Sequence, residues 1–211
     1  MQKHLFPKHA FKSLSSAINR RYSTNIYPAS KRVFPTSGWT EIDKSLPIEE
    51  DSLPNFKAGK FYPARIGEVF NNRYQAVGKL GYGSSATIWL CRDLLGGQGN
   101  RYVTLKMYTL GTETREVEVY DHLESVKSSH AGQTCLRGLT EVFQTKNLVQ
   151  EGVHTCLVHP PLGKSLEQLL PLLPERRMTI AMVRTTIRNI LAALDYLHTE
   201  AGVIHTGWYI N

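Results

Sequence analysis

A glycine-containing turn between two strand-like segments constrains the fold most. Residues 74–80 alternate loosely between polar and apolar side chains, as a half-buried strand does, and residues 87–91 are strand-like again. The segment 81–86 between them carries two glycines, which let backbone N–H groups approach a phosphate chain closely. Taken alone, such a segment is also typical of an ordinary hairpin turn. No helical pattern follows it, which argues against a dinucleotide-binding turn.

A lysine and a glutamate follow this hairpin at informative places. Lys106 lies within the β-rich segment 101–108, and Glu116 begins the helically spaced segment 115–123. A glutamate that faces the sheet can pair with the lysine and hold its ammonium against phosphates. The alternative is a partly exposed ion pair worth at most about 1 kcal/mol. Hairpin, strand lysine and helix glutamate occur in the order found in the ATP-holding lobe of protein kinases.

Two segments resemble the SR-protein-specific (serine/arginine-rich splicing factor) kinases, and the resemblance is strongest to the fungal members of that family. The segments are YPARIGEVFNNRY (62–74) and GYGSSATIWL (81–90). Ala86 stands where serine is usual in that family. The resemblance covers about residues 60–206. It implies an α+β fold, with the antiparallel sheet and single helix of a kinase small lobe and only the first helices of the large lobe. It also implies ATP as cosubstrate, with ATP-binding residues Leu80, Gly81, Tyr82, Gly83, Ser84, Ser85, Ala86, Ile88, Lys106, Glu116, Pro160 and Leu162.

Residues 154–163 resemble the last small-lobe strand and the hinge of that family. By this match His159 is the gatekeeper, and the backbone at Pro160 and Leu162 meets the adenine. Proline has no N–H, but position 160 needs only a carbonyl acceptor. A zinc site is not expected from His154, Cys156 and His159, because spacings of two and three along one strand do not converge the side chains and a fourth ligand is missing.

The resemblance ends soon after a helix predicted over residues 178–198, with Gly202 as its stop. Residues 203–206 resemble the start of the catalytic loop, but Gly207 stands where the family has aspartate. No residue matches the family's Mg²⁺-binding asparagine and aspartate, and Asn211 is not assigned that role. A general base contributes about 10²–10⁴ in rate. We therefore expect no intact catalytic residue, no metal site and no kinase activity from this chain alone.

The net charge of +7 arises at the N-terminus. Residues 1–40 hold seven basic side chains and no acid, and the remainder carries 18 of each sign, so a nucleic-acid-binding globule is not expected. Three cysteines favour a reducing compartment. No apolar run reaches the roughly 18–20 residues of a membrane span. The basic N-terminus is either a mitochondrial transit peptide, with a cleavage site at Arg20-Arg21, or a disordered tail on a cytoplasmic or nuclear protein.

These patterns divide the chain into a basic leader (1–35), an extended linker with short ordered pieces (36–73), a small lobe with hinge (74–163) and an incomplete large lobe (164–211). Three functions stay open. The first is a serine/threonine kinase acting on Arg-Ser-rich proteins. The second is a pseudokinase fragment, ATP-binding or not, that regulates a full-length kinase. The third is a truncated, non-functional gene product. The apolar face of the last helix predicts aggregation or capture of a partner.

Overall fold

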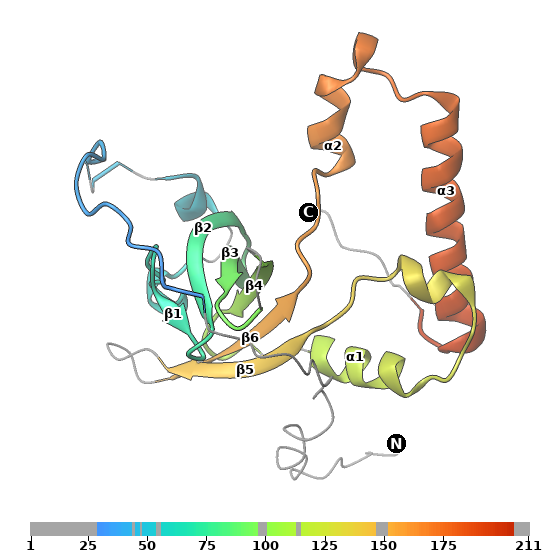
Figure 1. Ribbon diagram of the computed structural model, residues 1–211, viewed down its shortest axis with the longest axis horizontal. Helices are drawn as coiled ribbons and strands as arrows, with labels where there is room; N and C mark the ends of the chain where they lie inside the picture. The colour runs from blue at the N-terminus through green and yellow to red at the C-terminus, as the bar shows by residue number, and fades with distance from the viewer. Residues whose placement is uncertain are drawn as a thin grey trace.

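The computed structural model describes residues 29–204 except 44, 47, 54–55, 97–100, 113–114 and 147–151. The leader up to residue 28 and the segment from His205 through Gly207 to Asn211 lie outside the described residues. The strands and α-helices are β1 (Val69–Phe70), β2 (Tyr74–Tyr82), β3 (Ala86–Asp93), β4 (Tyr102–Tyr108), α1 (Glu116–Ser125), β5 (Glu141–Lys146), β6 (Val153–His159), α2 (Leu166–Leu169) and α3 (Ile180–Asp195) (Figure 1).

The strands form one antiparallel sheet in the order β1-β2-β3-β4-β6-β5. The predicted α+β class is confirmed, as are the predicted hairpin, lysine strand, helix and hinge strand. β1 and β5 were not predicted. β1 has only two residues, too few to show alternation. β5 is the last strand in the sheet order, where it pairs with β6. Among the described residues, none of the helices combines the length and the hydrophobicity of a membrane span.

One face of the sheet carries the larger apolar core. Alternate residues of three strands meet there, as period-2 geometry requires, and they include Trp89, Leu105 and Val158. Tyr62 and Ala64, which precede β1, pack against this core. A cavity of about 250 Å³ lies between the segment 56–64 and Trp89. Part of the segment 36–73 therefore covers the sheet directly.

Residues 29–32 also lie against the sheet. The Ala29 amide donates to the Leu94 carbonyl at 2.8 Å. The Gln75 side chain pairs with both backbone groups of Arg32, accepting at 2.9 Å and donating at 2.8 Å. Because Gln75 is only 1% exposed, these bonds satisfy a buried carboxamide that would otherwise destabilise the fold.

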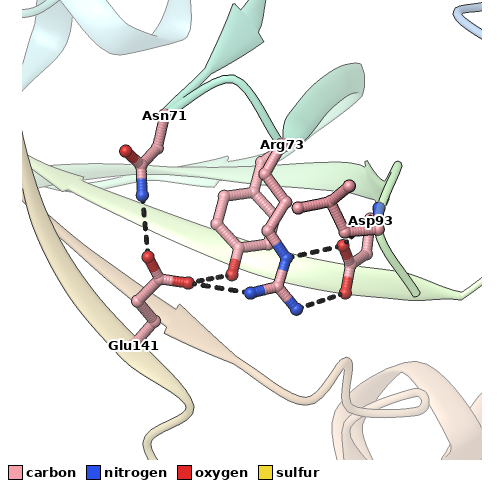
Figure 2. Close-up of polar contacts among 6 residues, drawn as sticks. Asn71, Arg73, Asp93 and Glu141 are labelled. Atoms are coloured by element: carbon pink, nitrogen blue, oxygen red, sulfur yellow. Dashed lines mark hydrogen bonds and ion pairs between the residues drawn. The ribbon is translucent and has the colours of Figure 1, made fainter. Parts of the chain in front are cut away.

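A polar cluster fastens the β1–β2 turn to the strands beside it (Figure 2). The Arg73 guanidinium donates to both carboxylate oxygens of Asp93, at 2.7 and 2.8 Å, and to Glu141 at 3.2 Å. Glu141 also accepts from Asn71 at 2.7 Å and from the Tyr74 hydroxyl. Asn71 has a left-handed backbone with φ of +48°, and its side-chain bond helps to hold that strained turn.

The second face of the sheet is covered by α1. Ala86, Tyr108 and Leu157 form a small buried cluster there, and Val117 and Tyr120 of α1 pack on it. Figure 1 shows α1 beneath the sheet, with α3 standing apart from the sheet beyond the end of α1.

The helix α3 joins the rest of the molecule at its C-terminal end. Tyr196 and Leu197, in a single π-turn that continues α3, pack against Leu123 of α1. A 3₁₀ turn, η3 (Ala131–Cys135), lies so close to α3 that a Cβ at Gly132 would be 1.8 Å from the Ala192 carbonyl oxygen. Glycine is therefore required at this contact.

The predicted apolar stripe of α3 faces solvent over much of its length. Ile187, Ile190 and Leu191 are 51%, 53% and 59% exposed. The Thr179 hydroxyl caps the helix by accepting from the Met182 amide at 3.3 Å. Gly202, the predicted stop, follows the π-turn with φ of +62°, a conformation that glycine adopts without strain.

Candidate nucleotide-binding site

The sheet register places three of the predicted ATP-binding residues in one row. Gly81 of β2 lies opposite Ile88 of β3, and Ile88 lies opposite Lys106 of β4. Leu157 of β6 continues the row beside Lys106. Residues directly opposite one another project to the same face, so Ile88 and Lys106 both lie on the face that α1 covers. Gly81, Ile88 and Lys106 therefore lie side by side on three neighbouring strands.

Lys106 and Glu116 form the predicted ion pair. The Lys106 ammonium lies 2.5 Å from Glu116 Oε2 on the first residue of α1. The side chains are 21% and 29% exposed, so the pair is neither a free surface pair nor a fully buried one. Burial lowers the pKa of Lys106, but its contacts with Glu116 and Tyr108 outweigh burial and leave that pKa raised. Burial raises the pKa of Glu116, and its donors outweigh burial in the same way and leave that pKa lowered.

Tyr108 is a third member of this group that sequence reasoning did not single out. Its hydroxyl donates to Glu116 Oε2, and the Lys106 ammonium lies 4.8 Å from the centre of its ring. The sequence did contain a signal for it, because Tyr108 is two residues from Lys106 and residues two apart on a strand share a face. The sequence alone did not indicate that the hydroxyl reaches the helix.

The glycine-containing turn has unused amide groups. The Gly83 amide donates to the Ala86 carbonyl at 2.9 Å, and the Ser85 carbonyl accepts from the Thr109 amide at 2.9 Å. Within the described residues, the amides of Ser84 and Ser85 donate to no acceptor. Both residues are exposed. Adjacent free amides at a turn are the groups that anion-binding loops present to phosphate oxygens.

His159 ends β6 and lies against Glu116. It is 1% exposed, and its Nδ1 lies 3.0 Å from the Gly138 carbonyl, so Nδ1 carries the proton that is donated. Its Nε2 lies 4.0 Å from Glu116 Oε1. Burial lowers the pKa of His159, which keeps the imidazole neutral. The predicted gatekeeper is thus placed between the hinge and the Lys106–Glu116 pair.

The predicted hinge residues are exposed. Leu162 is 68% exposed, and Pro160 follows β6 directly. The Pro160 carbonyl, the predicted adenine acceptor, accepts a 3.2 Å hydrogen bond from Arg137. Nothing in the sequence pattern indicated Arg137, because it lies 23 residues away in an irregular segment.

The remaining predicted positions are less enclosed. Leu80 and Tyr82 of β2 are 56% and 38% exposed. His154, considered above for zinc, is buried, and its ring nitrogen Nδ1 pairs with the Tyr108 carbonyl at 2.8 Å. In the part of the chain that the structure describes, no three metal-ligating side chains converge.

Relatives of the chain are kinases. A serine/threonine protein kinase of Aspergillus fumigatus is 40% identical over 180 residues, which make up 85% of this chain and 44% of that protein. Human SRSF protein kinase 3 is 32% identical over 163 residues, which make up 75% of this chain and 28% of that protein. The chain thus spans less than half the length of these relatives. No protein-family model matches the chain.

A crystallised kinase domain has a similar fold, with a TM-score of 0.50 at 21% identity, over 66% of this chain and 39% of that domain. This likeness confirms the predicted kinase-type arrangement of antiparallel sheet and helix. The chain is a homologue of the serine/threonine protein kinases, and its relatives include SRSF protein kinases and fungal kinases.

Proposed function

We propose that this chain binds ATP between the glycine-containing turn, Lys106 and the hinge. The single observation that carries the proposal is the Lys106–Glu116 ion pair, on the same sheet face as the hairpin residue Ile88. A half-buried ammonium held by a carboxylate offers a fixed positive charge to a phosphate chain. The free amides of Ser84 and Ser85 offer further donors. The Pro160 carbonyl and the Leu162 backbone, beside the gatekeeper His159, would receive the adenine.

The Aspergillus fumigatus relative is named a serine/threonine protein kinase, and the human relative is named a protein kinase. We propose that the whole protein belongs to this activity class and that its substrates are Arg-Ser-rich proteins, as the name of SRSF protein kinase 3 suggests. Gly207 at the expected aspartate position supports the further proposal that these 211 residues do not transfer phosphate by themselves. We also propose that the chain divides into four segments, with boundaries after residues 35, 73 and 163. The location that we propose is cytoplasmic or nuclear, with mitochondrial targeting by the basic N-terminus as the alternative.

A thermal-unfolding titration tests ATP binding. A ligand that binds only the folded state stabilises it, by about 2.7 kcal/mol at one hundred times its dissociation constant. We expect ATP to raise the melting temperature of the full chain and to have little effect on Lys106→Ala. Equal responses of the two proteins would refute this site. Magnesium-dependent transfer to an Arg-Ser peptide, abolished by Lys106→Ala, would refute the proposed inactivity.

A regulatory role is the second candidate, and the exposed stripe of α3 favours it. Ile187, Ile190 and Leu191 present apolar surface that a protein partner could cover. A full-length kinase relative is the partner we propose for this role. Co-purification of the two chains, lost in Ile187→Lys, is the expected result.

A further inference from the structure

Tyr108 occupies a fixed place beside the Lys106–Glu116 pair. It is 5% exposed and lies opposite Ala86 of β3 in the sheet register. Its backbone carbonyl is held by the His154 ring at 2.8 Å. The ring packs in the small cluster that α1 covers, which points the hydroxyl at Glu116 Oε2. The hydroxyl is therefore anchored to the rigid sheet, whereas Glu116 belongs to the helix.

We propose that Tyr108 is a positioning residue that holds Glu116, and through it Lys106, in the geometry that receives the nucleotide phosphates. The inference rests on the proposed binding of ATP and adds a residue to that site. Tyr108 itself need not touch the nucleotide.

The first turn of α1 needs such a tether. Glu116 is the first residue of the helix, and the preceding Arg115 gives it no side-chain cap. Unsatisfied helix ends fray, and a frayed first turn would carry Glu116 away from the sheet. The Tyr108 hydroxyl bonds this residue directly to β4 and so opposes that movement.

Lys106 holds Glu116 less firmly once a nucleotide is bound. An ammonium has three protons, and phosphate oxygens that approach Lys106 compete with Glu116 for them. The Tyr108 hydroxyl has one proton, which is committed to the carboxylate, so this bond persists while Lys106 turns to the phosphates. His159 cannot replace it, because its Nδ1 donates to Gly138 and its neutral Nε2 is an acceptor that faces another acceptor.

Titrations of ATP and of adenosine against the full chain test the proposal. The variants are Tyr108→Phe, which removes the hydroxyl and keeps the ring, and Tyr120→Phe as the matched control. Tyr120 packs in the same cluster, and within the described residues its hydroxyl makes no hydrogen bond. Tyr108→Phe should weaken ATP binding about threefold to tenfold, the value of one net hydrogen bond, and leave adenosine binding unchanged. Tyr120→Phe should leave both unchanged.

The pH dependence of ATP binding distinguishes the proposed positioning role of Tyr108 from a role in packing alone. Loss of packing alone would not shift this pH dependence. The groups that face Glu116 are Lys106 and Tyr108 from β4, His159 from β6 and Tyr120 from its own helix, with Arg137 close to His159. Loss of the hydroxyl removes a donor to the ionised carboxylate. The acid limb of the affinity profile should therefore move to higher pH in Tyr108→Phe and stay in place in Tyr120→Phe.

An unchanged ratio of ATP to adenosine affinity in Tyr108→Phe, or an equal loss in Tyr120→Phe, would overturn the proposal. Absence of ATP binding by the wild-type chain would instead refute the proposed function. In that event a double-mutant cycle on the free energy of unfolding, combining Tyr108→Phe with Glu116→Gln, still decides the tether. Coupling of the two substitutions supports it, and additivity overturns it.

Discussion

The guanidinium of Arg137 donates a 3.2 Å hydrogen bond to the carbonyl oxygen of Pro160, the first residue after β6. Pro160 and Pro161 have no N–H groups, so neither can donate to a neighbouring strand. Arg137 approaches from the irregular segment between η3 and β5. It thereby holds the start of the hinge from outside the sheet.

Replacing Arg137 should weaken adenine binding. The Pro160 carbonyl has two lone pairs, so it can accept from Arg137 and from the adenine at the same time. In Arg137→Met this carbonyl loses the donor that orients it, so we expect adenosine and ATP to bind about twofold to tenfold more weakly, by the same factor. Calorimetric titration measures both. Arg184→Met, which removes an exposed arginine of α3, is the control and should bind normally. A loss for ATP with none for adenosine would contradict this role.

The Arg73–Asp93 pair should contribute strongly to stability. Arg73→Leu leaves the Asp93 carboxylate, 2% exposed, without its bidentate partner. Breaking a fully buried pair costs about 3–5 kcal/mol, and because the Arg73 side chain is 29% exposed we expect about 2–3 kcal/mol. Urea unfolding gives the value. Arg177→Leu breaks a pair whose side chains are 81% and 80% exposed and should change stability very little. Equal effects of the two substitutions would show that burial of Asp93 is unimportant.

Gly132→Ala should separate η3 from α3. Its methyl group would lie 1.8 Å from the Ala192 carbonyl oxygen, and that backbone cannot yield without moving the helix. Overpacking of this kind costs about 1–3 kcal/mol. The control is Gly138→Ala, where an added Cβ meets no atom within 4 Å. Thermal unfolding compares the two, and a neutral Gly132→Ala would mean that η3 and α3 are not held this closely.

His159 should make the fold less stable in mild acid. Burial lowers its pKa below the ordinary 6.5, so the folded state binds a proton less readily than the unfolded state. The contribution of neutral His159 to the free energy of unfolding is therefore complete above about pH 6.5. It is lost as the pH falls through the lower pKa of the folded state. The pKa of Glu116 is lowered from 4.5, so protonation of Glu116 reduces the free energy of unfolding only at still lower pH. Urea unfolding at pH 7.5 and 5.5 should show a smaller drop in His159→Leu than in the wild type. An equal drop would assign the acid sensitivity to other groups.

The apolar stripe of α3 should promote self-association. Ile187→Lys places a charge on a side chain that is 51% exposed, so we expect less association and a nearly unchanged melting temperature. Light scattering over a range of concentrations measures the first quantity. Asn189→Lys adds the same charge to the same helix at an exposed position outside the stripe and should have no such effect. Equal improvement by both variants would indicate that net charge is the cause.

The sequence predicted the parts of the fold that depend on local periodicity. Alternation located β2 and β3, helical spacing located α1 and α3, and their order indicated that Lys106 and Glu116 meet. Contacts between distant segments left no such signal. Arg73 and Glu141 are 68 residues apart, and their bond exists only because β5 lies beside the β1–β2 turn. The role of Tyr108 depends likewise on where α1 comes to rest, which no pattern within β4 records.

The contact of residues 29–32 with the sheet has a practical consequence for shortening this protein. The sequence pattern suggests Tyr74 as a natural first residue for a minimal fragment. Such a fragment would lose Tyr62 and Ala64 from the outer core and would leave the Gln75 carboxamide without the Arg32 backbone, at a cost of about 1–3 kcal/mol for the carboxamide alone. Fragments made for crystallisation should therefore begin no later than Ala29.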